Sequence, residues 1–405
     1  MRYFSLIIVL VFFSDMTAQT WEPVGTGVTR SDLDYDAVMA LYPFHNKLYI
    51  GGKFVYSGNR KVNSLASWNG TKIDTVGTGL DSIVSAFTEY KGQLCIGGGF
   101  YHRALLVRRA ANVILWNDST GVWTGMGAGL DDCKSCPLFP KVTTLNVYNG
   151  ELMAGGAHTG WSAENNLVTL TKWTGDKWLP LYNNSKIYNI SNTGQYISSS
   201  TIYNGKLYFG YEDAYSMNAH KNAVMIWDGT QLKSISGSLA INNKITINLG
   251  AWVLAMTVYN GDLYIGGFMR IGPGNNPLNG IMKCNDTVLT EVGKGVNGYV
   301  NSMAVYNGKL YVGGVFDSAG GKPARNIAVW DGKEWSAVGN GLEANPKHDF
   351  KGNVTFRGRV AALAVYKNEL YAGGTFDFSG TTPLNNLAKL KLDRHDIKPK
   401  PRKKK

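Results

Sequence analysis

Seven copies of one sequence pattern make up most of the chain, and this repetition constrains the fold more than any other feature. The clearest copy runs from Asn301 to Leu342, and its Leu-Tyr-x-Gly-Gly core recurs at intervals of 46 to 60 residues. The core begins at Leu48, Leu94, Leu152, Leu207, Leu263, Leu310 and Leu370, and the fourth copy degenerates to LYFGY. Because a repeat of this length cannot bury its apolar face alone, each copy must pack against its neighbours.

Each copy resolves into four short strands separated by turn signals. In the sixth copy, SMAVY and KLYVGG flank an Asn-Gly pair, and NIAVW runs into Asp-Gly. These dipeptides tolerate the positive φ that a tight hairpin needs. The paired glycines are expected where backbone or a bulky side chain approaches closely, and the fourth strand carries Trp followed by Gly-x-Gly. Four antiparallel strands repeated seven times predict an all-β fold, a seven-bladed β-propeller.

Aromatic residues recur at fixed positions of the repeat, which is typical of packing rather than of binding. We expect these side chains in the core: Tyr49, Tyr208, Tyr264, Tyr311, Tyr371, Trp68, Trp116, Trp173, Trp227 and Trp330. The Gly-Gly pair of the second strand and the Trp of the fourth resemble the kelch or galactose-oxidase-type propeller repeat, in a secreted bacterial form. This resemblance implies the fold but no particular activity, because such propellers host unrelated functions.

The seventh copy lacks a fourth strand, and the missing strand is found at the other end of the chain. From Val360 the copy supplies AALAVY, ELYAGGTF and NNLAKLKL and then enters a basic tail. The segment WEPVGTGV, residues 21–28, matches the fourth strand of other copies, such as WSAVGNGL from Trp335. We therefore predict that the two ends of the chain share one blade and close the ring, which removes two unpaired strand edges.

The ends of the chain carry further signals. Met1 and Arg2 precede an apolar run and small residues, so residues 1–19 are interpreted as a cleaved signal peptide. That run is too short for a transmembrane helix, and no later segment is apolar enough to be one. We expect the propeller to span residues 20–392 and a disordered basic tail to span residues 393–405. The predicted location is the periplasm or the extracellular space.

The net charge of +12 is concentrated at the end of the chain. Residues 389–405 hold nine basic and two acidic residues, which is +7 and leaves only +5 for everything else. The folded body is therefore mildly basic, and we expect no nucleic-acid partner. The tail KPKPRKKK could contact an anionic surface, but a solubilising frayed end explains it equally well.

Loop length varies on one face of the predicted propeller only. The turns between first and second strands and between third and fourth strands are tight, so the long loops share the opposite face, where binding residues are most often found. Candidate binding residues on these loops are Arg103, Arg108, Arg109, His158, Trp161, Tyr215, His220, Arg325, His348 and Arg357. Their mixture of cations and aromatics suits a partner protein, an acidic peptide or a glycan.

Signals for metal, disulfide and catalytic sites are few. Asp32, Asp34 and Asp36 form a weak calcium candidate, although the glycine and glutamate of an EF-hand loop are missing. Cys133 and Cys136 form CKSC, for which a local disulfide is expected outside the cytoplasm. Cys95 and Cys284 lie singly in strands and are expected to be small buried residues.

No recognisable catalytic set appears in the sequence. A galactose-oxidase-like copper site cannot be assembled from the six histidines, and the NDSTGVW segment from Asn117 has the wrong spacing for an Asp box and is interpreted as a turn. We expect a non-catalytic, exported protein-binding scaffold of the cell envelope without a cofactor. A narrower hypothesis is a soluble subunit of an outer-membrane assembly or secretion complex. The alternative is a glycan-binding or glycan-degrading enzyme with a site scattered over several loops.

Overall fold

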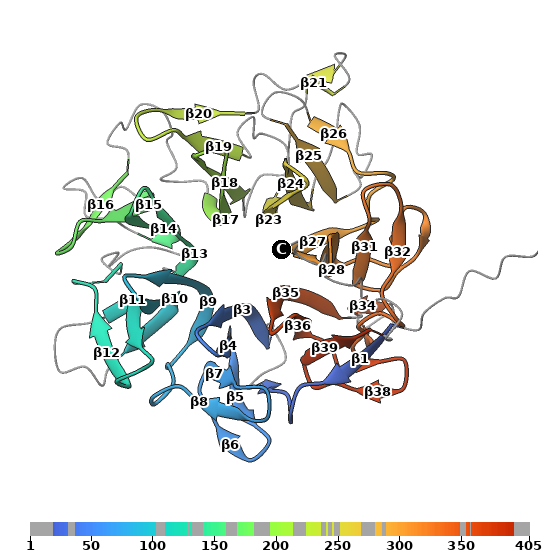
Figure 1. Ribbon diagram of the computed structural model, residues 1–405, viewed down its shortest axis with the longest axis horizontal. Coiled ribbons are helices and arrows are strands. Elements are labelled where there is room, and N and C mark those ends of the chain that lie inside the picture. The colour runs from blue at the N-terminus through green and yellow to red at the C-terminus, as the bar shows by residue number, and fades with distance from the viewer. Residues whose placement is uncertain are drawn as a thin grey trace, which may run out of the picture.

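The computed structural model describes residues 19–30, 37–102, 110–127, 129–130, 141–158, 168–181, 195–213, 224–235, 240–241, 245–246, 252–268, 280–285, 289–348, 354–356 and 358–392. These residues form seven four-stranded antiparallel sheets arranged around a central axis (Figure 1). The prediction of an all-β, seven-bladed β-propeller is confirmed. Within the described residues there is no helix, and hence none long and apolar enough to cross a membrane.

Each blade contributes its first strand to the inner ring and its fourth to the outside. Blade 1 is β3(Val38–Phe44), β4(Lys47–Gly52), β7(Leu65–Trp68), β8(Ile73–Thr75); blade 2 is β9(Ile83–Tyr90), β10(Gln93–His102), β11(Ala110–Asn117), β12(Val122–Gly125); blade 3 is β13(Lys141–Tyr148), β14(Glu151–His158), β15(Val168–Trp173), β16(Trp178–Pro180). Blade 4 is β17(Gln195–Tyr203), β18(Lys206–Asp213), β19(Val224–Trp227), β20(Leu232–Ser234); blade 5 is β23(Trp252–Tyr259), β24(Asp262–Phe268), β25(Ile281–Cys284), β26(Leu289–Glu291). Blade 6 is β27(Tyr299–Tyr306), β28(Lys309–Val315), β31(Ile327–Trp330), β32(Trp335–Ala337).

Blade 7 confirms the predicted closure of the ring. It consists of β35(Arg359–Tyr366), β36(Glu369–Thr375), β39(Leu387–Lys391) and, from the other end of the chain, β1(Thr20–Pro23), which pairs with β39 in the register Trp21↔Leu390. Trp21 is buried and donates its indole N–H to the carbonyl of Val338 in blade 6 at 3.3 Å. Trp335 and Trp178 make the equivalent bond to the preceding blade, so Trp21 occupies the repeat position predicted for it.

The glycine at the fourth position of each repeat core, which is the first of the Gly-Gly pair in six of the seven copies, receives a branched side chain from the next blade. A Cβ added at Gly51 would lie 2.5 Å from Val84 Cγ1, and one at Gly266 would lie 2.5 Å from Val300 Cγ1. The same contact recurs at every seam: Gly51/Val84, Gly97/Val142, Gly155/Ile197, Gly210/Val253, Gly266/Val300, Gly313/Val360 and Gly373/Val38. The last pair joins blade 7 to blade 1. Only glycine leaves room for this packing.

The second glycine of the pair serves a β-bulge in the first strand of its own blade. In blade 6 the register shifts between Val300 and Ser302, so Asn301 is an extra residue. This shift brings the carbonyl of Tyr299 against Gly314, where a side chain would collide with it. A bulge at the matching position occurs in all seven first strands, including that of blade 4, where Tyr211 stands in place of the second glycine.

The tight-turn face carries a second repeated contact between blades. The last Tyr of a first strand donates its hydroxyl to a turn carbonyl of the next blade, for example Tyr259 to Gly308 at 3.0 Å and Tyr366 to Asn46 at 2.7 Å. The other members of this set are Tyr148, Tyr203 and Tyr306. The predicted core positions are also buried, except that Trp173 and Trp227 are half-buried.

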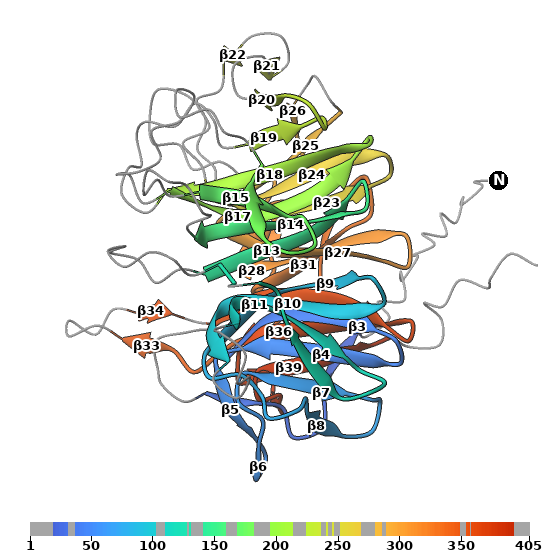
Figure 2. The same ribbon diagram turned by 90° about the vertical axis from the view of Figure 1, so that its left-hand side faces the viewer.

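Small extra hairpins decorate the opposite face, which we call the loop face. They are β5(Phe54–Ser57)/β6(Arg60–Lys61) with β2(Thr29–Arg30), β21(Ala240–Ile241)/β22(Ile245–Thr246), β29(Ser318–Ala319)/β30(Lys322–Pro323), β33(Lys347–His348)/β34(Val354–Phe356) and β37(Phe378–Ser379)/β38(Thr382–Pro383). Figure 2 shows β33 and β34 projecting to the side away from the tight hairpin turns. The predicted contrast between the two faces is therefore present in the described residues.

Removing the closing strand is expected to open the ring. Deletion of residues 21–28, or the single change Trp21→Ala, should lower the free energy of unfolding, by about 3–5 kcal/mol for the point variant because a buried indole is lost. Thermal and urea unfolding would measure this, and size-exclusion chromatography would detect association through the exposed edge. Glu22→Gln in the same strand breaks only exposed ion pairs with Lys389 and Lys391 and should cost under about 1 kcal/mol. An unchanged melting temperature in the deletion would contradict closure.

The glycine contact between blades predicts a size-compensation effect. Gly313→Ala places a methyl group against Val360 and should destabilise the protein by about 1–3 kcal/mol through overpacking. Combining it with Val360→Ala should give a double variant more stable than the two single effects would predict when added. Urea titration of the four proteins tests this, and strict additivity would show that the two residues do not compete for one space.

Candidate functional site

Most of the predicted binding residues lie outside the described part of the chain. This applies to Arg103, Arg108, Arg109, Trp161, Tyr215, His220 and Arg357, to the calcium candidates Asp32, Asp34 and Asp36, and to Cys133 and Cys136. His158 and His348 are placed by their backbones at the loop-face ends of β14 and β33. These assignments remain predictions. Cys95 and Cys284 are buried free thiols, as expected.

Arg325 is the one predicted binding residue whose side chain is described. It lies before the third strand of blade 6, on the loop face, and its guanidinium pairs with Glu343 at 2.6 Å. The hydrogen bond and charge of Glu343 raise the pKa of Arg325. The arginine side chain is 58% exposed, so it can still meet a partner while this pair positions it.

Equivalent positions at the start of the seven first strands define what we call the inner rim of the loop face. Each is the residue just before the Val or Ile that packs against glycine. In blade 1 this residue, Ala37, immediately precedes β3. From blade 1 to blade 7 the rim residues are Ala37, Ile83, Lys141, Tyr196, Trp252, Tyr299 and Arg359. The rim is thus uneven: three successive blades carry aromatics, a cation stands at each end of this arc, and blades 1 and 2 carry small or aliphatic residues.

The aromatic arc continues into the second strand of blade 5. Phe268 pairs with Trp252 across the hairpin, and it stacks on Tyr299 of blade 6 with ring centroids 4.7 Å apart and planes inclined by 20°. The ring centroid of Trp252 lies 5.9 Å from that of Phe268 and 6.3 Å from that of Tyr299. All three side chains are half-buried. This aromatic cluster bridges the seam between blades 5 and 6 at the loop face.

The bulge residues just below the rim differ in their hydrogen bonding. Ser85 donates to the carbonyl of Val142 in the next blade at 2.7 Å, and Thr143 and Ser198 bond the equivalent carbonyls of Ile197 and Val253. The matching residue of blade 6 is Asn301. Its Oδ1 is buried and has no hydrogen-bond partner within the described residues, and the same is true of the neighbouring Ser302 Oγ. Unused hydrogen-bonding capacity therefore lies in blade 6, close in sequence to Tyr299 of the aromatic cluster.

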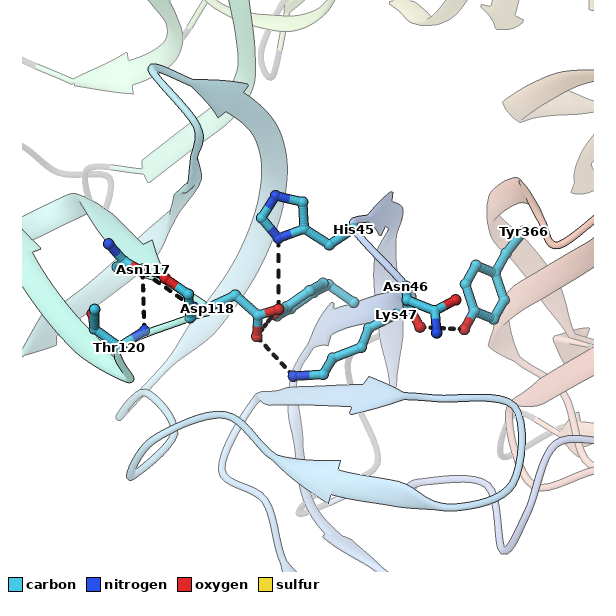
Figure 3. A network of polar contacts seen from close by, with 9 residues as sticks. His45, Asn46, Lys47, Asn117, Asp118, Thr120 and Tyr366 are labelled. Atoms are coloured by element: carbon cyan, nitrogen blue, oxygen red, sulfur yellow. Dashed lines mark hydrogen bonds and ion pairs between the residues drawn. The ribbon is translucent and has the colours of Figure 1, made fainter.

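A second polar cluster occupies the tight-turn face at the seam between blades 1 and 2 (Figure 3). Asp118 of blade 2 accepts hydrogen bonds on Oδ1 from Tyr49 at 2.6 Å and Lys47 at 2.7 Å, and its Oδ2 lies 3.7 Å from His45 Nδ1. His45 adopts φ 50° in the hairpin turn and stacks on Phe44. Other blades carry Tyr at the position of Phe44, so this cluster replaces the missing hydroxyl contact.

Hydrogen bonding decides the protonation of this polar cluster. Burial by itself raises the pKa of Asp118, but hydrogen bonds from Lys47 and Tyr49 and the charge of Lys47 outweigh it, so its pKa is lowered. Burial, followed by the hydrogen bond and charge of Asp118, raises the pKa of Tyr49. Asp118 is thus an ionised acceptor and Tyr49 a neutral donor. The acceptor Asp118 and the donors Tyr49 and Lys47 satisfy each other's hydrogen bonding, as expected of a structural contact between blades.

The sequence contained a signal for both clusters. The first strands YISSSTIY, WVLAMTVY and YVNSMAVY begin with an aromatic residue in consecutive copies. Aligning the seven copies at this position would have found the rim. The turn interpretation of NDSTGVW is confirmed, because Asn117 caps the amides of Ser119 and Thr120. Asp118, the second residue of this turn, is the one that reaches blade 1.

Comparison with known proteins adds little to this picture. No protein-family profile matches the chain, and no curated protein sequence matches it. The chain is similar to the solved structure of the computationally designed Ika8 protein, with a TM-score of 0.44 and 13% identity over 90% of this chain and 99% of the other. It is also similar to the structure of YjhT, with a TM-score of 0.44 and 13% identity over 76% of this chain and 99% of the other.

The polar cluster predicts a stability difference that depends on pH. Asp118→Asn should lower the free energy of unfolding at pH 7 by about 1–3 kcal/mol, because charge-assisted hydrogen bonds in a mostly buried site are lost. The folded pKa lies below the unfolded value, so this contribution is full above about pH 4 and disappears as pH falls through the folded pKa. Urea titrations at pH 7 and below pH 3 measure it. Asp74→Asn is the control, because Asp74 pairs with exposed Arg60 and Lys72; an equal loss in both variants would contradict the role of Asp118.

Proposed function

We propose that the protein is an exported, non-catalytic propeller of the kelch-like type that binds a partner protein through its loop face. The observation that carries the proposal is the half-buried aromatic cluster of Trp252, Phe268 and Tyr299 at the inner rim. Aromatic residues of this kind dominate the binding energy of protein interfaces. The ring does not need aromatic residues at the rim position, since blades 1, 2, 3 and 7 carry none there.

The opposite face supports the same proposal because its side chains are already used between blades. Tyrosine hydroxyls bond the turn carbonyls of the next blade, and Asp228 and Asp331 cap their own turns. The loop face instead carries hairpins that differ from blade to blade. Variable loops on a rigid scaffold are the usual location of binding residues.

The expected partner is a protein of the cell envelope, and the narrower form of the proposal makes the chain a soluble subunit of an outer-membrane assembly or secretion complex. The basic residues 393–405 follow the third strand of blade 7, which ends at the tight-turn face. We propose that they contact an anionic surface there, leaving the loop face directed away from it. A glycan-binding or glycan-degrading role is the second candidate.

Affinity purification of the tagged protein from crosslinked native cells tests the proposal. We expect a stoichiometric protein partner with the wild type and loss of most of it with Tyr299→Ala or Trp252→Ala, since truncating an interface anchor costs about 2 kcal/mol or more. Lys309→Ala, on the tight-turn face, should retain the partner, and thermal melts would show that all variants are folded. A wild-type chain that purifies alone, or that depolymerises a glycan, would overturn the scaffold role.

A further inference from the structure

We propose that the inner rim binds an acidic peptide segment of the partner, with an apolar side chain on the aromatic cluster and carboxylates facing Lys141 and Arg359. This inference rests on the proposed function, because the peptide belongs to the partner protein. The ligand is then an acidic peptide, and it binds along the inner rim from blade 3 to blade 7.

The arrangement of charge along the rim favours an acidic ligand. Lys141 of blade 3 and Arg359 of blade 7 stand at the two ends of the aromatic arc. The residues paired across the hairpin from the seven rim positions include one further cation, Lys53, and one acid, Glu212. By position, the rim residues and their hairpin partners therefore include three cations and one acid. An excess of cations would orient an acidic segment and speed its association.

The aromatic cluster favours a peptide over a sugar. Phe268 covers one face of Tyr299 and Trp252 is inclined to Phe268, so the rings form a compact apolar patch instead of separate open platforms. Such a patch suits an apolar side chain flanked by acids. An anionic polysaccharide would bring many hydroxyls, which the rings of this patch cannot hydrogen-bond.

Two hydrogen-bonding atoms of blade 6, close in sequence to Tyr299, are unused in the described part of the chain. Asn301 Oδ1 is a buried acceptor and Ser302 Oγ a buried hydroxyl, and neither has a partner within the described residues. An extended segment presents one N–H and one C=O per residue. Because Asn301 Oδ1 is buried, a ligand amide would reach it only after the Asn301 side chain turns toward the rim. That hydrogen bond would satisfy an atom that is otherwise costly to bury. Among the polar bulge residues that the structure describes, Asn301 is the one with an unused buried oxygen, since Ser85, Thr143 and Ser198 are bonded at the matching bulge.

Selection of a random twelve-residue peptide library displayed on phage against the immobilised whole protein tests the inference. We expect the selected peptides to be enriched in Asp and Glu around an apolar or aromatic residue. The affinity of the strongest synthetic peptide should fall about tenfold with Lys141→Gln and again with Arg359→Gln, as one charge-assisted contact is lost each time. The matched controls Lys309→Gln and Lys333→Gln remove the same charge from the tight-turn face and should change affinity less than about twofold.

Replacing the peptide's acids with Asn and Gln gives a readout that leaves the protein untouched, and it too should weaken binding by about tenfold or more. Selected peptides without acidic enrichment, no binders at all, or equal effects of rim and control variants would overturn the inference. If no peptide is selected, and the wild type binds polygalacturonate whereas Tyr299→Ala does not, the rim is a glycan-binding site instead. If no acidic peptide is selected but the wild type still captures a partner from crosslinked cells and Tyr299→Ala does not, the acidic-peptide inference fails while the scaffold proposal stands. The two failures are therefore distinguishable.

Discussion

The contact between a glycine of one blade and a branched side chain of the next holds the ring together. Seven such pairs run around the axis, from Gly51/Val84 to Gly373/Val38. Each buries a Val or Ile fully between two sheets, and burying one such side chain contributes about 1.5–3 kcal/mol. Because the last pair joins blade 7 to blade 1, every blade has two neighbours, and no sheet face is left uncovered at the centre.

Closure of the outer part of the ring depends on a different contact. Trp21 repeats the bond that Trp335 and Trp178 make to the preceding blade, although it comes from the opposite end of the chain. Backbone pairing of β1 with β39 supplies the fourth strand of blade 7. The seam between blades 1 and 2 shows how such a scheme tolerates change: Phe44 lacks a hydroxyl, and Asp118 with Lys47 and Tyr49 replaces the lost bond.

These requirements leave the loop face to vary. Strand ends there need no common side chain, so the seven rim positions range from Ala37 to Trp252. The aromatic cluster joins blades 5 and 6, and Asn301, whose Oδ1 has no partner within the described residues, belongs to blade 6. Because both features lie on one side of the axis, the rim is asymmetric. A ring of seven identical blades would have no such asymmetry.

Much of the fold could be predicted from the sequence, because a residue type that recurs at one position of the repeat makes the same packing contact in each blade. Recurrent Gly-Gly pairs, Asn-Gly turns and a displaced WEPVGTGV determined the blade count, the tight-turn face and the closure. The site could not be predicted in the same way. The candidates chosen for loop composition, such as Arg103 and His220, lie outside the described residues, and Asp118 was interpreted only as part of a turn. The sequence by itself determined which residues repeat and hence the propeller; only the tertiary structure decided that Trp252, Phe268 and Tyr299 meet, because that contact joins two blades across the seam and no local pattern encodes it.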